Sequence, residues 1–203
     1  MIVVFIAPFL WSLINIIDVY FVKSVYRDAS EGVIVSGLFQ IFPWLFVALG
    51  LLEFRVPGWS VFLLGLAGGG LYLLSYYFYF RSLFVVSDSV LIQIFWSLSM
   101  PLVPFLAFFL IGEKLFFVNY LGVLLVFSGI VIFLFREDSR LDRVEVLRIM
   151  KIMVGAVVGM ALSMVIQREM YKGLEGDFWS GYLLFSLGYL LCGVLFWVSS
   201  RDT

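Results

Sequence analysis

Apolar residues run along this chain in long stretches, and short polar or charged breaks separate one stretch from the next. Each stretch holds about twenty residues, which at 1.5 Å per residue lets a helix cross the hydrocarbon core of a bilayer. Strands of a membrane barrel need only about ten residues and alternate in polarity, so the pattern predicts helices. The predicted spans are 2–22, 33–52, 59–80, 89–111, 116–135, 152–170 and 178–199.

Most breaks between the spans are short, so we expect consecutive helices to be antiparallel neighbours. The longest connection, 136–151, carries the strongest block of charge in the chain. Leu141, Val144 and Leu147 recur within it at every third residue, a pattern that fits either a short amphipathic helix at the interface or a solvated linker. The predicted fold class is all-α: a polytopic membrane helix bundle of about seven transmembrane helices.

Composition agrees with lipid as the main solvent of the chain. Of its 203 residues 64% are hydrophobic and 13% are charged, about half the charged share of a soluble domain. The net charge of -1 leaves no basic footprint for nucleic acid. The apolar N-terminal run begins without a basic region or a cleavage site, so it is expected to be a mature span and not a signal peptide.

Several kinds of chemistry are excluded by what the sequence lacks. There is no histidine and one cysteine, Cys192, which excludes an internal disulfide, histidine-ligated metals and acid–base catalysis by histidine. No phosphate-cradling motif is present, so energy coupling would come from gradients or exchange. The sequence therefore predicts neither a cofactor nor a metal, and it does not predict an enzyme.

Polar side chains inside the spans are the candidate functional residues, because in lipid they are costly and by default face the bundle interior or a water-filled cavity. In the first span Trp11, Asn15 and Asp18 lie at i, i+4 and i+7, on one helical face. Asp18 lies near the end of its span, where a solvated or snorkelling carboxylate is the alternative. The third span adds a stripe of hydroxyl-bearing residues, for which packing is the alternative: Tyr72, Ser75, Tyr76 and Tyr79.

The span 89–111 combines a polar face with two prolines. Its polar face consists of Ser89, Gln93, Trp96, Ser97 and Met100. Gln93 and Trp96 are the pair that we favour for substrate contact. Pro101 and Pro104 each remove an amide donor, so carbonyls near positions 97 and 100 need another partner from protein or water. This favours a cavity beside the helix, with a packing kink as the alternative.

Small residues mark places where helix backbones can approach closely, since hydrophobicity does not drive helices together in lipid. They are Gly65 and Gly69, Gly122 and Gly129, and the ridge of Gly155, Gly159 and Ser163. Glu113 lies in a tight turn, where we expect a structural role beside the N-terminus of the next helix. Arg168 and Glu169 are expected to pair with each other or to reach the headgroups.

An internal repeat links the two ends of the chain. The first and sixth spans both carry small or polar residues midway and charges at the exit, and the second and seventh share a Ser-Gly start at Ser36 and Ser180. A five-helix unit followed by a second copy implies an inverted repeat, because an odd number of crossings reverses orientation. The expected organisation is 1–135 as the first five-helix repeat, 136–151 as a charged linker and 152–203 as the first two helices of a truncated second repeat.

Two groups of residues give the chain a resemblance to a known family. One is the opening set Leu10, Trp11, Asn15 and Lys23; the other runs from Tyr72 to Phe133 and includes Pro101, the Gly112-Glu113-Lys114 turn, Gly122 and Gly129. Together they resemble the EamA-like family of the drug/metabolite transporter superfamily, which has ten helices in two five-helix repeats. That family usually carries alanine where this chain has Tyr79, Arg81 or Gln93, so no ligand assignment transfers to those positions.

The resemblance implies an integral membrane secondary transporter that moves small organic metabolites or drugs by alternating access, here expected as a fragment of a ten-helix protein. The expected substrate-pathway residues are Asn15, Asp18, Tyr76, Gln93 and Trp96, with Asp18 also a candidate for proton coupling. The expected structural residues are Pro101, Pro104, Glu113, Gly122 and Gly129. The alternative function is a non-transporting membrane assembly or scaffold subunit.

The expected partners are a small-molecule substrate, the lipid bilayer, and either the missing second-repeat helices or a second subunit. The expected location is a cell membrane, as a multi-pass protein, with a bacterial or archaeal inner membrane favoured. Orientation stays open. Positive charges favour an external N-terminus with the linker 136–151 in the cytoplasm, whereas the family usually has its N-terminus inside.

Overall fold

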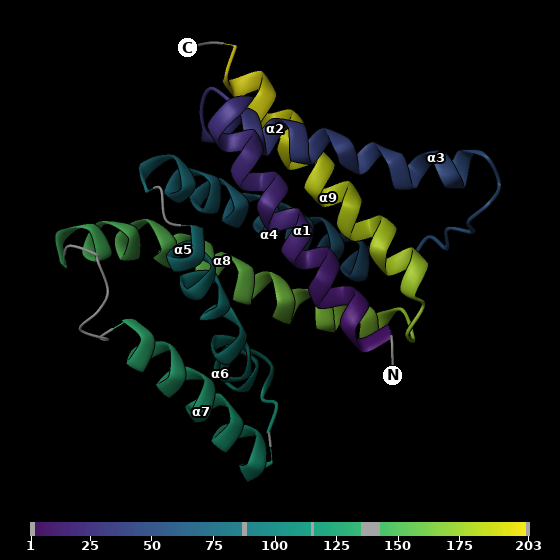
Figure 1. The fold of residues 1–203 in the computed structure, drawn as a ribbon. Helices are drawn as coiled ribbons and strands as arrows, with labels where there is room; N and C mark the ends of the chain where they lie inside the picture. Colours follow the sequence, from purple (N-terminus) through teal and green to yellow (C-terminus); the bar gives the residue numbers. More distant parts are fainter. Residues whose placement is uncertain (1–2, 87–88, 115, 135–142, 202–203) are drawn as a thin grey trace.

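The computed structural model describes residues 3–86, 89–114, 116–134 and 143–201, and every regular element within them is a helix (Figure 1). The elements are α1 (Val3–Ser24), α2 (Ala29–Leu38), the short 3₁₀ helix η1 (Phe39–Ile41), α3 (Phe42–Ala48), α4 (Trp59–Val85), α5 (Ser89–Ser97), α6 (Ser99–Ile111), α7 (Phe117–Leu134), α8 (Arg143–Gly173) and α9 (Phe178–Ser199). For this part of the chain the predicted all-α class is confirmed.

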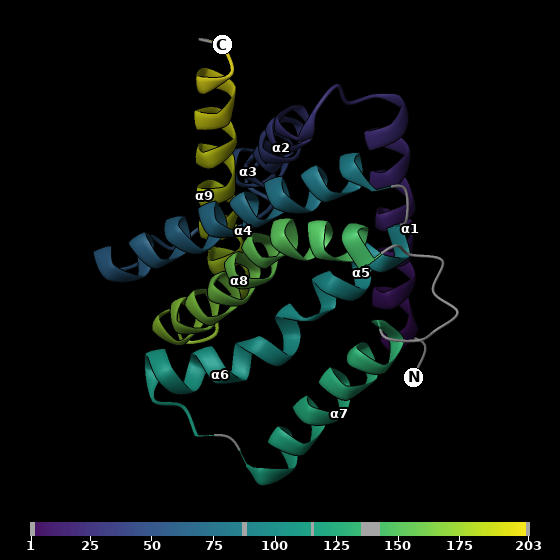
Figure 2. The ribbon, with the colours of Figure 1, turned by 90° about the vertical axis from the view of Figure 1, so that its left-hand side faces the viewer.

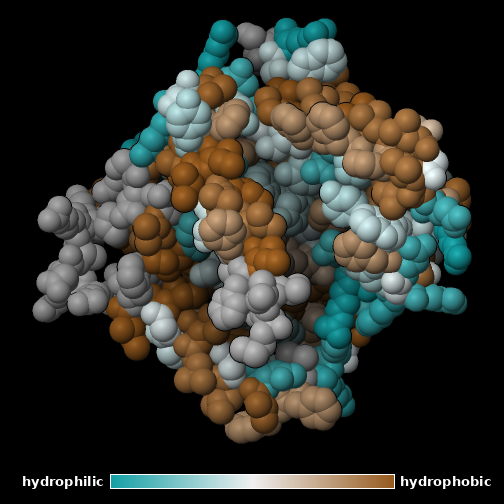
Figure 3. Space-filling model, turned by 45° about the vertical axis from the view of Figure 1, so that its right-hand side comes forward, coloured by the Kyte–Doolittle hydropathy of each residue, from teal (hydrophilic) through white to brown (hydrophobic). Residues whose placement is uncertain are grey.

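Five helical stretches are long and apolar enough to cross a membrane: Ala29–Ala48, Trp59–Val85, Val90–Ile111, Val146–Gly173 and Phe178–Ser199. α7 contributes a shorter apolar stretch, Phe117–Ile132, and α1 is 22 residues long. Large apolar side chains cover much of the outer surface (Figure 3), as expected where lipid is the solvent. The described chain is thus a membrane helix bundle, and seven crossings stay a prediction.

α4 is the central helix of the bundle. α8 and α9 both pack along it, α2 packs against α4 and α9, and α1 contacts α4 and α2 (Figures 1 and 2). The core around α4 contains side chains with almost no exposed surface, among them Leu73, Phe80, Ile92 and Met153. Most helices of the bundle therefore depend on α4 for their position.

Glycines bring α4 and α9 into backbone contact. A Cβ added at Gly69 would lie 2.0 Å from the carbonyl oxygen of Phe185, and one added at Gly188 would lie 2.3 Å from that of Leu66. A Cβ added at Gly65 would lie 2.7 Å from the Cβ of Leu184. The close approach predicted for Gly65 and Gly69 is confirmed.

The ridge of small residues on α8 packs against the opposite side of α4. A Cβ added at Gly155 would meet the ring of Phe78 at 2.9 Å, and one added at Gly159 would meet the Cβ of Ser75 at 3.2 Å. Ser163 Oγ donates a 2.8 Å hydrogen bond to the carbonyl oxygen of Gly68. This ridge also behaves as predicted, since it lets α8 lie close along α4.

The predicted span 89–111 is not one continuous helix. α5 ends at Ser97 and α6 begins at Ser99, with a bend between them that is visible in Figure 2. Pro101 cannot donate to the carbonyl four residues earlier, and Pro104 lies inside α6. Serine hydroxyls bond to carbonyls in this bend: Ser97 Oγ to Ile94 O at 2.7 Å and Ser99 Oγ to Trp96 O at 2.8 Å. The two prolines thus coincide with a kink, which the sequence analysis gave as the alternative to a cavity, and the kink also adjoins a cavity.

Two other boundaries differ from the sequence analysis. α8 begins at Arg143, so residues 143–151 of the predicted linker are the first turns of a 31-residue helix, while 136–142 lie outside the described residues. Gly122 and Gly129 of α7 contact no other helix of the described chain, because a Cβ added at either would meet nothing within 4 Å. The close approach expected at these two glycines therefore stays a prediction.

The N-terminus of α9 is capped by Asp177. Its Oδ1 accepts a hydrogen bond from the backbone N–H of Ser180 at 3.3 Å, and Ser180 Oγ accepts one from the backbone N–H of Arg55 at 3.0 Å. Hydrogen bonds from the Ser180 side chain and then its backbone lower the pKa of Asp177 below its usual range. The cap thus joins the start of α9 to the segment that precedes α4.

We expect this cap to make stability depend on pH at the acidic end of the range. The folded pKa of Asp177 lies below the unfolded value of about 3.9, so its contribution is present above that value and is lost as the pH falls through the folded pKa. The Asp177→Asn variant keeps a capping oxygen but does not titrate. Thermal unfolding of both proteins should show wild type more stable at pH 7 and the difference closing below about pH 4. A pH-independent difference would contradict this.

Candidate functional site

A large cavity in the described chain lies between the helices that carry the candidate residues. Its volume is about 960 Å³ and its wall includes residues of α1, α4, α5, α6, α8 and α9, a size typical of pockets for small organic ligands. Its aromatic wall includes Trp11, Tyr72, Tyr76, Trp96, Phe185 and Tyr189. Its carboxamide groups are those of Asn15, Gln40, Gln93 and Gln167.

Helical periodicity explains why these side chains meet. Trp11 and Asn15 lie four residues apart on α1, and Tyr72 and Tyr76 lie four apart on α4, so each pair projects from one face. Among the described residues, none of the side chains that line the cavity carries a charge. The wall therefore combines flat apolar surfaces with neutral hydrogen-bonding groups.

A hydrogen-bond network centred on Gln93 joins three helices at the cavity. Gln93 Nε2 donates to Asn15 Oδ1 of α1 at 2.9 Å and to the hydroxyl of Tyr79 of α4 at 2.7 Å. The Tyr79 side chain is nearly inaccessible, with 3% of its surface exposed. Because a buried hydroxyl without a partner is costly, this network fixes the position of Gln93.

Tyr76 lies at the centre of an aromatic cluster beside this network. Its ring centroid is 5.3 Å from those of Tyr72 and Trp96, 5.6 Å from that of Tyr79 and 6.3 Å from that of Tyr189. The rings meet edge to face or tilted, the arrangements that their quadrupoles favour. The cluster gives the cavity a rigid aromatic side built from α4, α5 and α9.

The structure places Asn15, Tyr76, Gln93 and Trp96 in one wall of this cavity. Asp18 is not among the residues that line it. Burial, and then the negative charges of Asp18 and Glu31, raise the pKa of Tyr26 in the connection between α1 and α2. Four of the five expected pathway residues thus line one cavity, and Asp18 is not among the residues that line it.

Several lining residues were not singled out from the sequence. Gln40 and Gln167 are carboxamides inside predicted spans, so the rule that selected Gln93 would have found them as well. Tyr189 of α9 gave no comparable signal, because its place beside Tyr72 and Tyr76 depends on how α9 packs against α4.

Glu113 has a structural partner that the sequence did not reveal. Gly112 adopts a left-handed conformation (φ 66°) and ends α6, which turns the chain so that Glu113 Oε1 pairs with Arg168 of α8. Glu169 pairs with Lys172 at 2.6 Å. The expected pairing of Arg168 with Glu169 is therefore wrong, because the turn after α6 brings a carboxylate within reach of Arg168.

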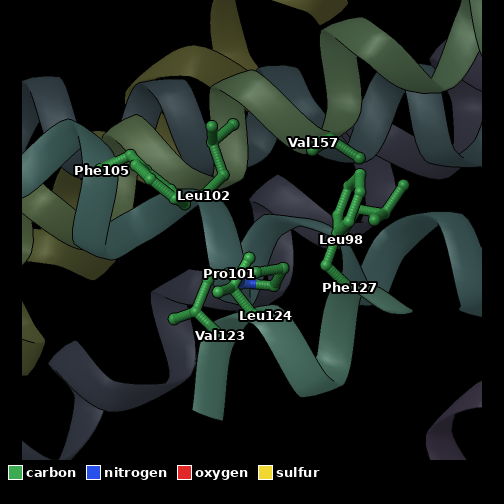
Figure 4. Close-up of a pocket in the computed structure, with 8 residues that line it drawn as sticks. All are labelled: Leu98, Pro101, Leu102, Phe105, Val123, Leu124, Phe127 and Val157. Carbon is green, nitrogen blue, oxygen red and sulfur yellow. The ribbon is translucent and has the colours of Figure 1, made fainter. Parts of the chain in front are cut away.

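A second cavity, of about 400 Å³, lies where α6, α7 and α8 meet (Figure 4). Apolar side chains line it, including Leu98, Pro101, Phe105, Phe127 and Val157. Without polar groups it has nothing to fix the orientation of a polar ligand. We therefore take the cavity around Gln93 as the candidate site.

The described residues contain no group of three or more His, Cys, Asp or Glu side chains that could hold a metal ion. Comparison of the chain with protein-family models, with curated proteins and with solved structures finds no match. The functional argument consequently depends on the cavity and on the residues that carry the resemblance.

Proposed function

We propose that the protein is a multi-pass membrane transporter of small organic solutes, similar to the EamA-like family of the drug/metabolite transporter superfamily, and that solutes pass through the cavity around Gln93 by alternating access. The single observation that carries this proposal is a cavity of about 960 Å³ lined by carboxamides and aromatic rings among membrane helices. Polar groups at this depth are costly and are kept in membrane proteins mainly where they serve a path or a site.

The packing of α2 against α9 also supports the proposal. These helices are the second of each predicted repeat, and their backbones touch: a Cβ added at Gly37 would lie 2.7 Å from the Cα of Gly193. Helices of an inverted repeat that are related by a pseudo-two-fold axis come together at that axis. In this proposal further helices, from the same chain or from a second subunit, complete the cavity.

Thiol accessibility tests the proposal without a known substrate. In a Cys192→Ala background, we expect a cysteine placed at Ser97, which lines the cavity, to react with a membrane-impermeant thiol reagent in intact cells and also in inside-out vesicles. Alternating access requires that the cavity open to each side in turn. The readout is the fraction of protein labelled from each side.

The matched control is a cysteine at Ser82, whose side chain is fully buried between α4 and α8. It should stay unlabelled from either side. Labelling of Ser97→Cys from one side only, or from neither, would contradict a transport path and would favour the non-transporting scaffold subunit.

A further inference from the structure

The free hydrogen-bonding groups of the Gln93 network form a small recognition motif. Both N–H groups of Gln93 Nε2 are used, one on Asn15 and one on Tyr79. Among the described residues, neither Gln93 Oε1 nor Asn15 Nδ2 has a hydrogen-bond partner, and both residues line the cavity. A free acceptor and a free donor thus belong to adjoining carboxamides, which the 2.9 Å hydrogen bond from Gln93 Nε2 to Asn15 Oδ1 holds together.

Aromatic rings flank this pair of groups. Trp96 is one helical turn from Gln93 on α5, and Tyr76 packs against Trp96 with ring centroids 5.3 Å apart. Aromatic faces stack on planar solutes such as nucleobases and add to their affinity. Gln40 and Gln167 supply further neutral carboxamides elsewhere in the wall.

No charged side chain of the described residues lines the cavity, and the two cations near Gln167 are paired. The cations closest to Gln167 along α8 are Arg168, which pairs with Glu113, and Lys172, which pairs with Glu169. Asp18 is not among the described residues that line the cavity. An ion that entered would lose hydration without a charged side chain in the lining to replace it, which costs far more than burying a neutral group whose hydrogen bonds are satisfied.

We infer that the cavity selects uncharged planar solutes that carry a hydrogen-bond donor and acceptor together on one edge, as a primary carboxamide on an aromatic ring does. The carboxamide would donate to Gln93 Oε1 and accept from Asn15 Nδ2, and its ring would lie against Trp96 and Tyr76. This inference rests on the proposed function, because it names the solute class for the same cavity.

Three probes of nearly equal size separate charge from shape: nicotinamide, which is neutral, nicotinate, which is an anion, and 1-methylnicotinamide, which is a cation. Equilibrium dialysis of radiolabelled probes against the full chain in nanodiscs gives the affinities. We expect saturable nicotinamide binding at least about tenfold tighter than binding of either ion, because no charged side chain of the described residues lines the cavity. Gln93→Ala should weaken nicotinamide binding by about tenfold or more.

Two variants make the result specific to the site. Asn119→Ala removes a carboxamide that lies exposed on α7, outside the cavity lining, and should leave binding unchanged. Gln93→Glu keeps the size of the side chain but adds a negative charge, so the preference should move several-fold toward 1-methylnicotinamide. This shift of preference would not follow from a merely structural role of Gln93.

The outcomes separate this inference from the proposed function. Equal or tighter binding of either ion to wild type would overturn the solute class and leave a transport path intact. Binding of none of the three probes would also overturn the class, and the Ser97→Cys labelling from both membrane sides then decides independently whether the transport proposal falls with it.

Discussion

Gly69→Ala is expected to lower the thermal unfolding temperature of the purified protein by roughly 2–12 °C. A Cβ at this position would lie 2.0 Å from the carbonyl oxygen of Phe185 and 2.7 Å from the backbone nitrogen of Tyr189. Both atoms belong to the backbone of α9, so neither can move without shifting the helix. Overpacking of this kind costs about 1–3 kcal/mol, and each 1 kcal/mol lowers Tm by about 2–4 °C for a chain of this size.

The neighbouring glycine provides a matched control in the same helix. A Cβ added at Gly70 has ample room, since its nearest neighbours are the Cβ of Cys192 and the carbonyl oxygen of Gly188, both at 3.9 Å. Gly70→Ala should therefore leave Tm unchanged or raise it slightly, because alanine favours a helix over glycine by about 0.5–1 kcal/mol. Equal losses in the two variants would show that α4 and α9 are not held in backbone contact.

Gly69→Ala should also disturb the cavity, because α4 and α9 each contribute part of its wall. Phe185 and Tyr189 of α9 pack against Tyr72 of α4 at centroid distances of 5.4 Å and 5.7 Å. Separating the two backbones would move these rings apart. The architecture of small residues and the aromatic side of the candidate site are thus parts of one helix contact.

The sequence predicted some residues of the cavity wall and not others. Residues on one helical face could be assigned from spacing alone, which is why Asn15, Gln93 and Trp96 were selected and are found in one wall. Spacing could not separate Asp18 from Asn15, since both lie on the same face of α1. Asp18, which lies nearer the end of α1, does not line the cavity. Other helices form most of the cavity wall, and the sequence of α1 does not specify where they lie.

Contacts between distant helices were the least accessible to sequence reasoning. Gly188 meets Leu66, yet it belongs to no motif with a four-residue spacing on α9. Arg168 and Glu113 are 55 residues apart, and only the turn at Gly112 brings them together. In each case the physical cause is the packing of helices, which hydropathy along the chain does not encode.

The predicted start of the sixth span, residue 152, differs from the observed start of α8 at Arg143. The charges of 136–151 set this segment apart from the next span, as either a solvated linker or a short amphipathic helix, but α8 extends back to Arg143 and includes its last nine residues. Charged residues are compatible with a helix when it extends beyond the apolar layer, since only the hydrocarbon core penalises them. The apolar stretch Val146–Gly173 is accordingly shorter than the helix that contains it.

The second large effect is expected for Gln93→Leu, which removes the donor shared by Tyr79 and Asn15. It leaves the buried Tyr79 hydroxyl without its partner, at a cost of about 1–3 kcal/mol. Tyr79→Phe in the same protein removes that hydroxyl, so the double variant should be less destabilised than the sum of the two single variants. Hydrogen bonds between membrane helices give coupling energies of ~0.6 kcal/mol on average and up to about 1.7 kcal/mol.

Unfolding in a detergent series would measure this coupling, and Tyr77→Phe combined with Gln93→Leu is the control. Tyr77 lies on α4 against Phe78 and Phe196, away from the Gln93 network, so that pair should be additive. Additivity in both pairs would contradict a hydrogen bond between Gln93 and Tyr79. The double variant also separates two roles of Gln93: Tyr79→Phe removes the unpaired hydroxyl but cannot restore Gln93 Oε1, so nicotinamide binding should stay weakened in the double variant.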